Sequence, residues 1–202
     1  MSSIKKLFIC FRYAPKKFKS RSEQFEKLFQ RQTDPWNFQN SAWEKNRFNR
    51  VVELVKMIRP KNLLEIGCAE GDLTKELSSF CPNITAVEIS PTAIAKAKQK
   101  STTARFINAD IAQLNHFFDQ NEFDLTVATE ILYYLTQAEI KKILNTLKTK
   151  HLLTSNFWTV SKPIEVLIES AGYKPIKTER VFGFETFQLK ISKISLWQKI
   201  SN

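Results

Sequence analysis

Apolar residues follow two rhythms along the chain, and both are clearest between residues 60 and 172. Short continuous apolar runs predict strands at residues 62–66, 84–88, 104–108, 123–129 and 151–154. Between them, apolar residues at helical spacing predict helices at residues 72–80, 91–100, 138–147 and 161–171. Such alternation is typical of a parallel sheet with right-handed crossovers and helices on both faces.

The two ends of the chain depart from this alternation. Residues 21–30 have helical spacing, and a second helix is predicted from Ser41 to Arg59. Ser41 and Glu44 have the spacing of a capping box, and Pro60 disfavours a helical conformation at Arg59.

The last part of the chain contains two further apolar segments. Residues 173–181 and 184–194 predict two strands joined near Gly183, as an antiparallel hairpin. The whole pattern predicts an α/β fold, with a doubly wound, mostly parallel seven-stranded sheet and an antiparallel C-terminal strand.

The segment Glu-Ile-Gly-Cys-Ala-Glu-Gly, which begins at Glu65, separates the first predicted strand from the helix after it. Its glycines, Gly67 and Gly71, allow the backbone at Cys68 and Ala69 to approach a ligand without hindrance from Cβ. Ligands of doubly wound sheets bind beyond the carboxyl ends of the strands, where strand order reverses. We therefore expect these five residues to bind a ligand.

Two further carboxylates follow the next two predicted strands. Glu88 ends the second strand and precedes Ile89, and Asp110 follows the third and precedes Ile111. A carboxylate after the second strand can accept hydrogen bonds from ribose hydroxyls, and one after the third can accept a bond from an exocyclic amino group of a base. Three acidic groups at one edge of the sheet predict a nucleoside site.

The details of the first turn distinguish between nucleoside ligands. A dinucleotide fingerprint has a glycine where this chain has Ala69, and Glu70 would repel a diphosphate. Glu65 suits a ligand with a cationic amine instead. This chemistry favours S-adenosyl-L-methionine over NAD.

These same residues resemble class I S-adenosylmethionine-dependent methyltransferases. Residues 65–71 are similar to the first motif of that class, usually Asp/Glu-x-Gly-x-Gly-x-Gly, and Glu88, Asp110 and residues 123–130 match its later motifs in order. The resemblance covers residues 45–155 and implies S-adenosyl-L-methionine as cofactor. Ala69 departs from the motif and leaves the conformation of the turn open.

A narrower resemblance involves the amino-terminal part. Residues 25–29, 34–38 and 43–48, with the Glu-Ile-Leu-Tyr-Tyr-Leu segment at 130–135, are similar to nodulation-protein-S-like methyltransferases. Founding members of that family N-methylate the free amine of a deacetylated chitooligosaccharide. The resemblance implies methyl transfer to an amine or hydroxyl of a small molecule such as a sugar, with the amine favoured.

Candidate catalytic residues follow the fourth predicted strand. Glu130 leaves it toward the expected position of the sulfur, beside Thr129, and is predicted to orient the acceptor or take its proton; a helix-start carboxylate is the equal alternative. Tyr133 is predicted to line the methyl pocket. Tyr134 is expected in the core and His151 in a structural role.

Two tryptophans of the amino-terminal segment are candidates for a lid. Trp36 follows the turn at Asp34 and Pro35, which positions it well over the donor, and we place it with the cofactor-binding residues. Trp43 could serve in the same way. The alternative is that both side chains dock the first helices onto the sheet.

The chain has 202 residues and a net charge of +11, which favours anionic partners. The lysines are spread along the chain, so a repulsive, solvated surface is the preferred interpretation and nucleic acid is not the favoured partner. Residues 1–20 are predicted to be a basic arm capable of weak contact with a membrane surface. Residues 21–202 are predicted to be one domain: lid helices 21–60, a cofactor core 61–160, and a C-terminal helix and strand pair 161–202.

The cysteines, histidines and apolar runs of the chain bear on metal binding and on the cellular compartment. Cys10, Cys68 and Cys81 form no disulfide or zinc pattern, and His116 and His151 are isolated, so no metal is expected. No apolar run is long enough to span a membrane and no secretory signal is apparent, which predicts a cytoplasmic protein.

Two other functions compete with methylation of a small molecule. Methylation of nucleic acid is supported by the charge alone, because the Asp/Asn-Pro-Pro-Tyr/Phe signature is absent after the fourth strand. A nucleoside-binding scaffold or membrane-surface adaptor could use the basic arm, but the intact acidic and glycine residues argue against an unused pocket. The oligomeric state is not determined by the sequence.

Overall fold

One mixed sheet organises the molecule. The computed structural model describes residues 20–185 and 188–200, so the predicted basic arm lies outside the described residues except for Ser20. The sheet has the order β3-β2-β1-β4-β5-β7-β6. Its strands are β1 (Asn62–Ile66), β2 (Asn83–Glu88), β3 (Arg105–Asn108), β4 (Glu122–Thr129), β5 (Lys148–Phe157), β6 (Tyr173–Glu185) and β7 (Gln188–Lys199).

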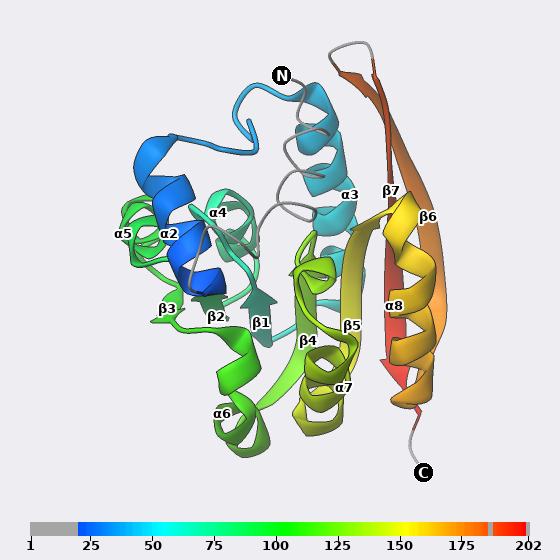
Figure 1. The fold of residues 1–202 in the computed structure, drawn as a ribbon. Helices are drawn as coiled ribbons and strands as arrows, with labels where there is room; N and C mark the ends of the chain where they lie inside the picture. Colours follow the sequence, from blue (N-terminus) through cyan, green and yellow to red (C-terminus); the bar gives the residue numbers. More distant parts are fainter. Residues whose placement is uncertain (1–19, 186–187, 201–202) are drawn as a thin grey trace.

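Strand directions confirm the predicted fold class. Neighbours from β3 through β5 pair in parallel, whereas β7 is antiparallel to both β5 and β6. The chain steps outward from β1 to β3 and then crosses to β4, so strand order reverses between β1 and β4 (Figure 1). The crevice at that reversal is where doubly wound sheets bind ligands.

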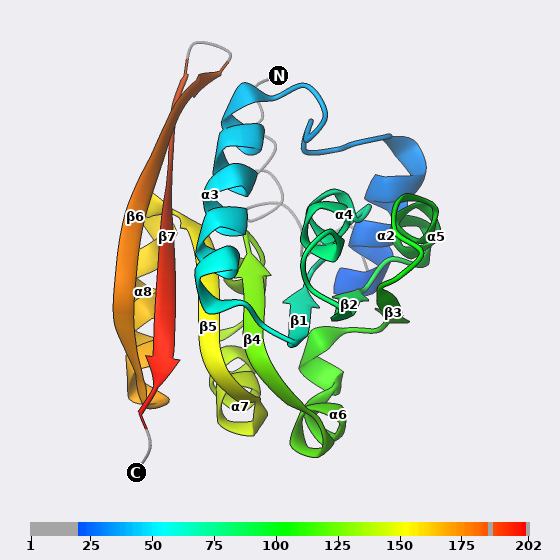
Figure 2. The same cartoon turned by 180° about the vertical axis from the view of Figure 1, so that it is seen from behind.

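Helices cover both faces of the sheet (Figures 1 and 2). One face carries α3 (Ala42–Ile58), α4 (Asp72–Ser78) and α5 (Pro91–Lys100). The other carries α6 (Asn115–Gln120), α7 (Gln137–Thr146) and α8 (Trp158–Ser170). The short helix α6 was not expected from the sequence.

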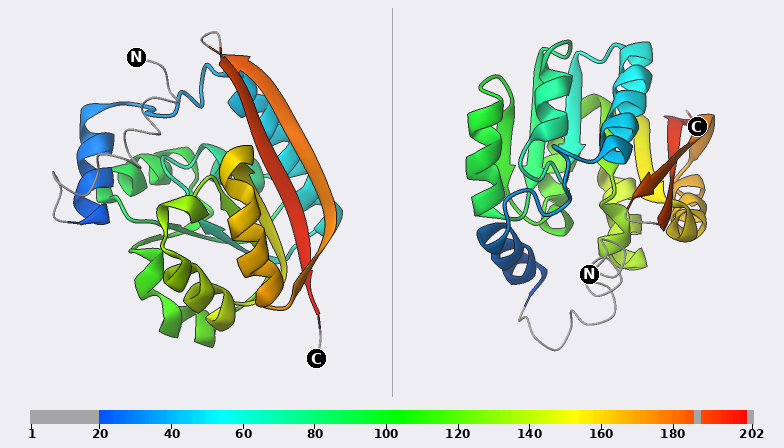
Figure 3. Two further views of the ribbon diagram at one scale, coloured as in Figure 1. Left: turned by 45° about the vertical axis from the view of Figure 1, so that its right-hand side comes forward. Right: turned by 90° about the horizontal axis from the view of Figure 1, so that it is seen from above.

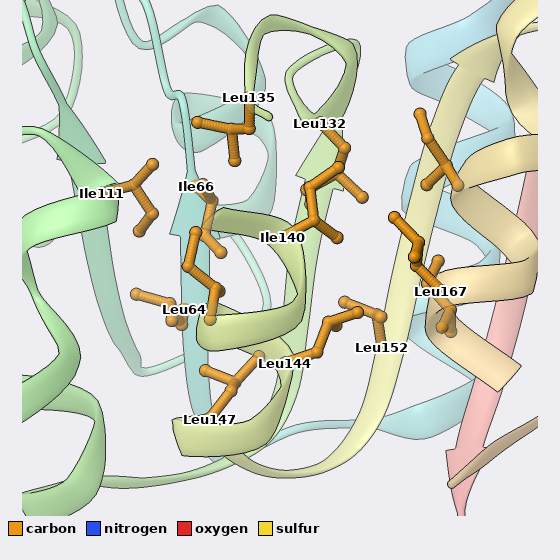
Figure 4. Close-up of a cluster of buried hydrophobic side chains, with 14 of the residues drawn as sticks. Leu64, Ile66, Ile111, Leu132, Leu135, Ile140, Leu144, Leu147, Leu152 and Leu167 are labelled. Carbon is orange, nitrogen blue, oxygen red and sulfur yellow. The ribbon is translucent and has the colours of Figure 1, made fainter. Parts of the chain in front are cut away.

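Two apolar cores result from the alternation of side chains along buried strands. Leu63 packs in the cluster with α3 and α4, whereas its neighbour Leu64 packs in the cluster with α7 and α8. Figure 4 shows Leu64 and Leu152 on the sheet opposite Ile140 and Leu144 of α7. Because both faces are covered, β1 is buried at every position after Asn62.

The helix α2 (Arg21–Arg31) and the hairpin of β6 and β7 lie on opposite sides of the molecule (Figure 3). Ser20 caps α2 by accepting a bond from the Glu23 amide at 3.1 Å. Within the described ranges, no helix has the length and apolar character required to cross a membrane.

The capping box predicted at the start of α3 is only half formed. The Ser41 hydroxyl accepts a bond from the Glu44 amide at 3.2 Å, as expected. The Glu44 carboxylate, however, accepts bonds from Arg47 instead of the Ser41 amide, and that amide donates to the Asn37 carbonyl at 2.9 Å. The charged Arg47, one helical turn away, therefore binds the Glu44 carboxylate in place of the Ser41 amide.

The turn that was predicted near Gly183 lies a few residues further along the chain. Gly183 lies inside β6, paired with Lys190, and the hairpin turns after Glu185. A Cβ at Gly183 would lie 2.1 Å from Cδ1 of Trp43. The glycine is therefore needed for close packing of the strand on α3, not for a turn.

Candidate active site

A cavity lies where strand order reverses, at the carboxyl ends of β1, β2, β3 and β4. It encloses about 990 Å³ of space, including solvent at its open mouth. Every predicted site residue except Gly71 contributes to its wall: Trp36, Glu65, Gly67, Cys68, Ala69, Glu88, Ile89, Asp110, Ile111, Thr129, Glu130 and Tyr133.

The turn after β1 takes an unusual backbone path. Gly67 and Ala69 both have positive φ, 74° and 49° respectively. A Cβ at Gly67 would lie 2.9 Å from Cγ1 of Ile131, so glycine is required there for space as well as conformation. Ala69 adopts the left-handed conformation without being a glycine, at a cost of roughly 1–2 kcal/mol. Alanine at this position of the motif therefore carries a backbone strain that glycine would not.

Gly71 has a different role from the one predicted. It is the N-cap of α4 with φ of 81°, and it does not line the cavity. A Cβ there would lie 2.8 Å from the Cβ of Ala97. Gly71 therefore allows α4 to pack closely against α5.

Glu65 is almost fully buried at the end of β1. It is 2% exposed, and its Oε2 accepts a hydrogen bond from the Thr74 hydroxyl at 2.6 Å. Burial raises the pKa of the Glu65 carboxyl to about 7, against the lowering effect of that hydrogen bond. A cationic group placed beside Glu65 would favour its ionised form.

Glu88 is held by the backbone around it. Its two carboxylate oxygens accept bonds from the amides of Ala69 at 3.1 Å and Ser90 at 3.0 Å. Burial raises the pKa of Glu88 despite these bonds. Each oxygen retains a further lone pair for a ligand hydroxyl.

Asp110 is bound by an arginine that sequence reasoning missed. Arg21 Nη2 lies 2.8 Å and 2.9 Å from the two Asp110 oxygens, 2.9 Å from Oε1 of Glu139, and Nη1 donates to the Tyr134 carbonyl at 3.2 Å. The hydrogen bond from Arg21 lowers the pKa of Glu139 to about 2. No local pattern marks Arg21, because its partners lie 89 to 118 residues away.

A second contact fixes α2 over the same edge of the sheet. The Glu26 carboxylate accepts bonds from the hydroxyls of Ser90 at 2.6 Å and Thr92 at 2.5 Å, just after β2. With Arg21 at one end and Glu26 in the middle, α2 is attached to the loops after β2 and β3. Through Arg21, Phe25 and Phe29 it forms one wall of the cavity.

Glu130 has the geometry of a positioned carboxylate. Its Oε1 accepts bonds from Ser155 at 2.7 Å and Ser192 at 2.8 Å, and its Oε2 accepts one from Tyr133 at 3.2 Å. Its φ of 54° places it in the left-handed region, and such strain occurs at functional sites. Oε2 keeps more free capacity than Oε1, so it is the oxygen able to meet a ligand.

Aromatic side chains form a closed chain of ring contacts at this end of the cavity, which we call the aromatic collar. Successive members, each in contact with the next and the last with the first, are Phe25, Trp36, Phe38, Phe48, Arg47, Trp43, Phe157, Tyr133 and Tyr134. All of these except Trp43 line the cavity. Aromatic faces attract cations, which suits a sulfonium or an ammonium group.

Two expectations concern members of the collar or residues beside it. Tyr134 lines the cavity on the 3-10 helix Leu132–Tyr134, with its ring centroid 5.1 Å from that of Phe25, and it also packs against the edge of the core. Trp36 is a wall residue, but Trp43 is 3% exposed and stacks on Phe157 at 5.6 Å, so it docks α3 instead of covering the ligand.

Arg47 is the one charged member of the collar. It is 1% exposed, and its Nε and Nη2 donate to Oε2 of Glu44 at 2.9 Å and 2.7 Å. Nη1 is buried without a hydrogen-bond partner among the described residues. The sequence pattern predicted Glu44 only as a cap, so this buried ion pair was missed.

Other sequence expectations concern residues away from the cavity chemistry. Nδ1 of His151 lies 3.3 Å from the Asp124 carbonyl in the middle of the sheet, which fits a structural role. Within the described ranges, no group of three His, Cys, Asp or Glu side chains is arranged to hold a metal ion.

Solved structures share this architecture. The crystal structure of N-methyltransferase NodS from Bradyrhizobium japonicum WM9, in complex with S-adenosyl-L-homocysteine, matches with a TM-score of 0.76. The match covers 90% of this chain and 100% of that chain at 21% identity, a level that shows the fold alone. The fold is therefore the Rossmann-like fold of class I methyltransferases.

Sequence comparison is more specific. Nodulation protein S of Sinorhizobium fredii is 37% identical over 103 residues, 50% of this chain and 48% of the relative. Ribosomal RNA small subunit methyltransferase A of Mycoplasmopsis synoviae is 35% identical over 106 residues, 52% of this chain and 40% of the relative. The profile of the family Nodulation protein S (NodS) matches residues 21–160, and the chain belongs to this family. It spans about half the length of the curated relatives it matches.

Proposed function

We propose that this protein transfers the methyl group of S-adenosyl-L-methionine to an amine of a small-molecule acceptor. One observation carries the proposal: the carboxylates at the carboxyl ends of β1, β2 and β3 line a single cavity together with Glu130. Membership of the NodS family supports it, as does the fold shared with an N-methyltransferase crystallised with S-adenosyl-L-homocysteine.

Each carboxylate has a role that its surroundings support. Glu65 would bind the cationic amine of the donor, which would favour ionisation of a carboxyl whose pKa is raised by burial. Glu88 would accept bonds from the ribose hydroxyls through its free lone pairs. Asp110 would accept a bond from the adenine amino group while it remains paired with Arg21.

The transfer itself needs positioning more than covalent chemistry. The carbon–sulfur bond of the sulfonium breaks as the carbon–nitrogen bond forms, so the acceptor nitrogen must lie in line with the sulfur and carry a free lone pair. Glu130 Oε2, steadied by Tyr133, would orient that nitrogen and take the proton that the methylated amine releases. The aromatic collar would exclude water from the sulfonium of the donor and from the ammonium that forms on the acceptor.

Calorimetry with S-adenosyl-L-homocysteine tests the donor site. We expect micromolar or tighter binding, no binding of NAD, and at least a tenfold loss of affinity in Glu88→Gln. Glu122→Gln is the matched control, because it removes the same charge from an exposed position at the other end of β4. Equal affinities for both variants would refute the ribose assignment, and no binding to the unaltered protein would refute the function.

Release of S-adenosyl-L-homocysteine from a panel of amines tests the reaction. Glu130→Gln should slow turnover while donor affinity stays within about twofold, because the proposed role lies beyond the sulfur. A loss of donor affinity instead would place Glu130 in the donor site.

A second candidate is methylation of RNA. The likeness to ribosomal RNA methyltransferase A and the net charge of +11 favour it. The segment Thr129-Glu130-Ile131 after β4 lacks the Pro-Pro signature of amino-methylation on nucleic acid. Transfer of labelled methyl groups to RNA, compared with the amine panel, distinguishes the two.

We place the protein in the cytoplasm, where Cys68 and Cys81, both free thiols, would remain reduced.

A further inference from the structure

In the buried ion pair of Glu44 and Arg47, one hydrogen-bond donor of the arginine has no acceptor among the described residues. Glu44 uses one oxygen, Oε2, for both bonds from Arg47. Arg47 Nη1 has none among the described residues, although the side chain is 1% exposed. An unmatched, buried, charged donor is strongly unfavourable, so native proteins retain one where a ligand or water completes it.

Arg47 occupies the part of the cavity beyond the donor residues. It lines the cavity with Glu44, Glu130, Tyr133 and Phe157. The charges of Arg47 and Glu130 lie close enough to interact. This end of the cavity therefore offers two incomplete groups: a donor at Arg47 Nη1 and an acceptor at Glu130 Oε2.

We infer that Arg47 is a specificity-determining residue, whose Nη1 donates a hydrogen bond to an oxygen of the acceptor molecule close to its reacting amine. The inference rests on the proposed function, in which Glu130 receives the amine. A molecule that completes both groups must carry a hydrogen-bond donor and an oxygen near one another. Simple alkylamines would leave Arg47 unmatched, and a binding site rejects ligands that leave its buried polar groups unpaired.

Access to Nη1 requires movement in the collar. Nη1 is closed to solvent, and the ring of Phe48 lies 4.8 Å from Cζ of Arg47. Phe48 is only half-buried and contacts Phe38, in the connection between α2 and α3. Displacement of the Phe48 ring by the acceptor would open Nη1, and binding of the acceptor oxygen would restore a hydrogen bond to it.

Two probes that differ by one hydroxyl test the inference: trans-2-aminocyclohexanol and cyclohexylamine. Their dissociation constants are measured on protein saturated with S-adenosyl-L-homocysteine. We expect the amino alcohol to bind at least tenfold more tightly to the unaltered protein. Equal affinities, or no binding of either amine, would overturn the inference.

Two variants identify the group responsible. In Arg47→Lys the ammonium would stay with Glu44, and in the double variant Glu44→Gln/Arg47→Met no unpaired charge remains, so at least one should fold. In either, the preference for the amino alcohol should fall to within twofold while S-adenosyl-L-homocysteine still binds. A preference that persists would show that another residue holds the oxygen. Failure of the unaltered protein to bind S-adenosyl-L-homocysteine would instead contradict the proposed function.

Discussion

Glu65 has its carboxyl group in a place that water does not reach, and its charge state depends on what lies beside it. Burial favours the neutral acid, whereas the Thr74 hydroxyl favours the carboxylate. A cationic ligand amine would change the balance toward the charged form. The residue proposed to bind the donor amine is thus one whose ionised form is disfavoured by burial near neutral pH.

This disadvantage predicts a pH dependence of stability. The folded pKa of Glu65 is about 7, above its ordinary value of 4.5, so the folded state binds the proton more tightly than the unfolded state. Its stabilising contribution is complete below about pH 4.5 and is lost as pH rises to about 7, by roughly 3 kcal/mol in all. Urea unfolding of the ligand-free protein should therefore show a smaller pH dependence in Glu65→Gln over this interval. Parallel curves for the two proteins would contradict the assignment.

At the scale of residues, the sequence predicted the acidic groups well and their partners poorly. Glu65, Glu88 and Asp110 were recognisable because each follows a strand of a recurring motif. Arg21 and Arg47 carry no such mark: one contacts residues distant in the chain, and the other pairs with a glutamate that also has the spacing of a cap. The spacing of residues along the chain does not show which donor will form a hydrogen bond with a given carboxylate.

At the scale of elements, α2 is held at the edge of the cavity by its buried Phe25 and Phe29 and by a few polar contacts. Arg21 joins it to Asp110 and Glu139, and these groups are only about one-fifth to one-third exposed. The pair with Glu139 uses both Nη atoms of Arg21, and partly buried, bidentate pairs are stronger than exposed ion pairs. Since α2 forms a wall of the cavity, its detachment is the step expected to release the product.

Arg21→Ala should therefore speed dissociation of S-adenosyl-L-homocysteine about tenfold, because two charge-assisted contacts of α2 are lost. Stopped-flow displacement measures the rate directly. Arg31→Ala is the matched control: it removes the same charge from an exposed position on the same helix. Equal rates in the two variants would show that α2 does not limit release.

The hairpin of β6 and β7 shows where element prediction failed. Its two strands were recognised from their apolar patterns, but its turn was placed at Gly183 because glycine often marks turns. The glycine is needed because Trp43, which is distant in the sequence, approaches its Cα closely. The residues around Gly183 do not indicate this contact. The helix α6 was missed for a related reason, since its six residues are too few for a clear period.

Gly183→Ala should destabilise the protein by about 1–3 kcal/mol, because the new methyl group would overlap the Trp43 ring. Thermal or urea unfolding measures the loss. Gly183→Asn, which a turn position would tolerate, should be at least as harmful. In a double variant with Trp43→Ala, which removes the two nearest atoms of the side chain, the added loss from Gly183→Ala should shrink, and simple additivity would contradict the contact.

At the scale of the whole molecule, the fold divides into a half that meets the cavity and a half that does not. The loops after β1, β2, β3 and β4 converge on the cavity with α2. The first half of β6, by contrast, lies at the far edge of the sheet, separated from the cavity by β5 and β7. The alternation of strands and helices predicted this division, because strand order alone determines which loops meet at the reversal.

Hydrogen exchange should reveal the same division when S-adenosyl-L-homocysteine is added. A ligand that binds only the closed state stabilises it by RT ln(1 + [L]/Kd), so at a hundredfold excess over Kd amides that exchange through opening of the cavity should slow by about 100-fold. We expect this protection in α2, in residues 66–72 and in residues 129–135, while residues 173–180 of β6 remain unchanged. Uniform protection along the chain would mean that exchange requires global unfolding. Protection confined to α2 would mean that the ligand binds outside the sheet edge, against the assignment of Glu65 and Glu88.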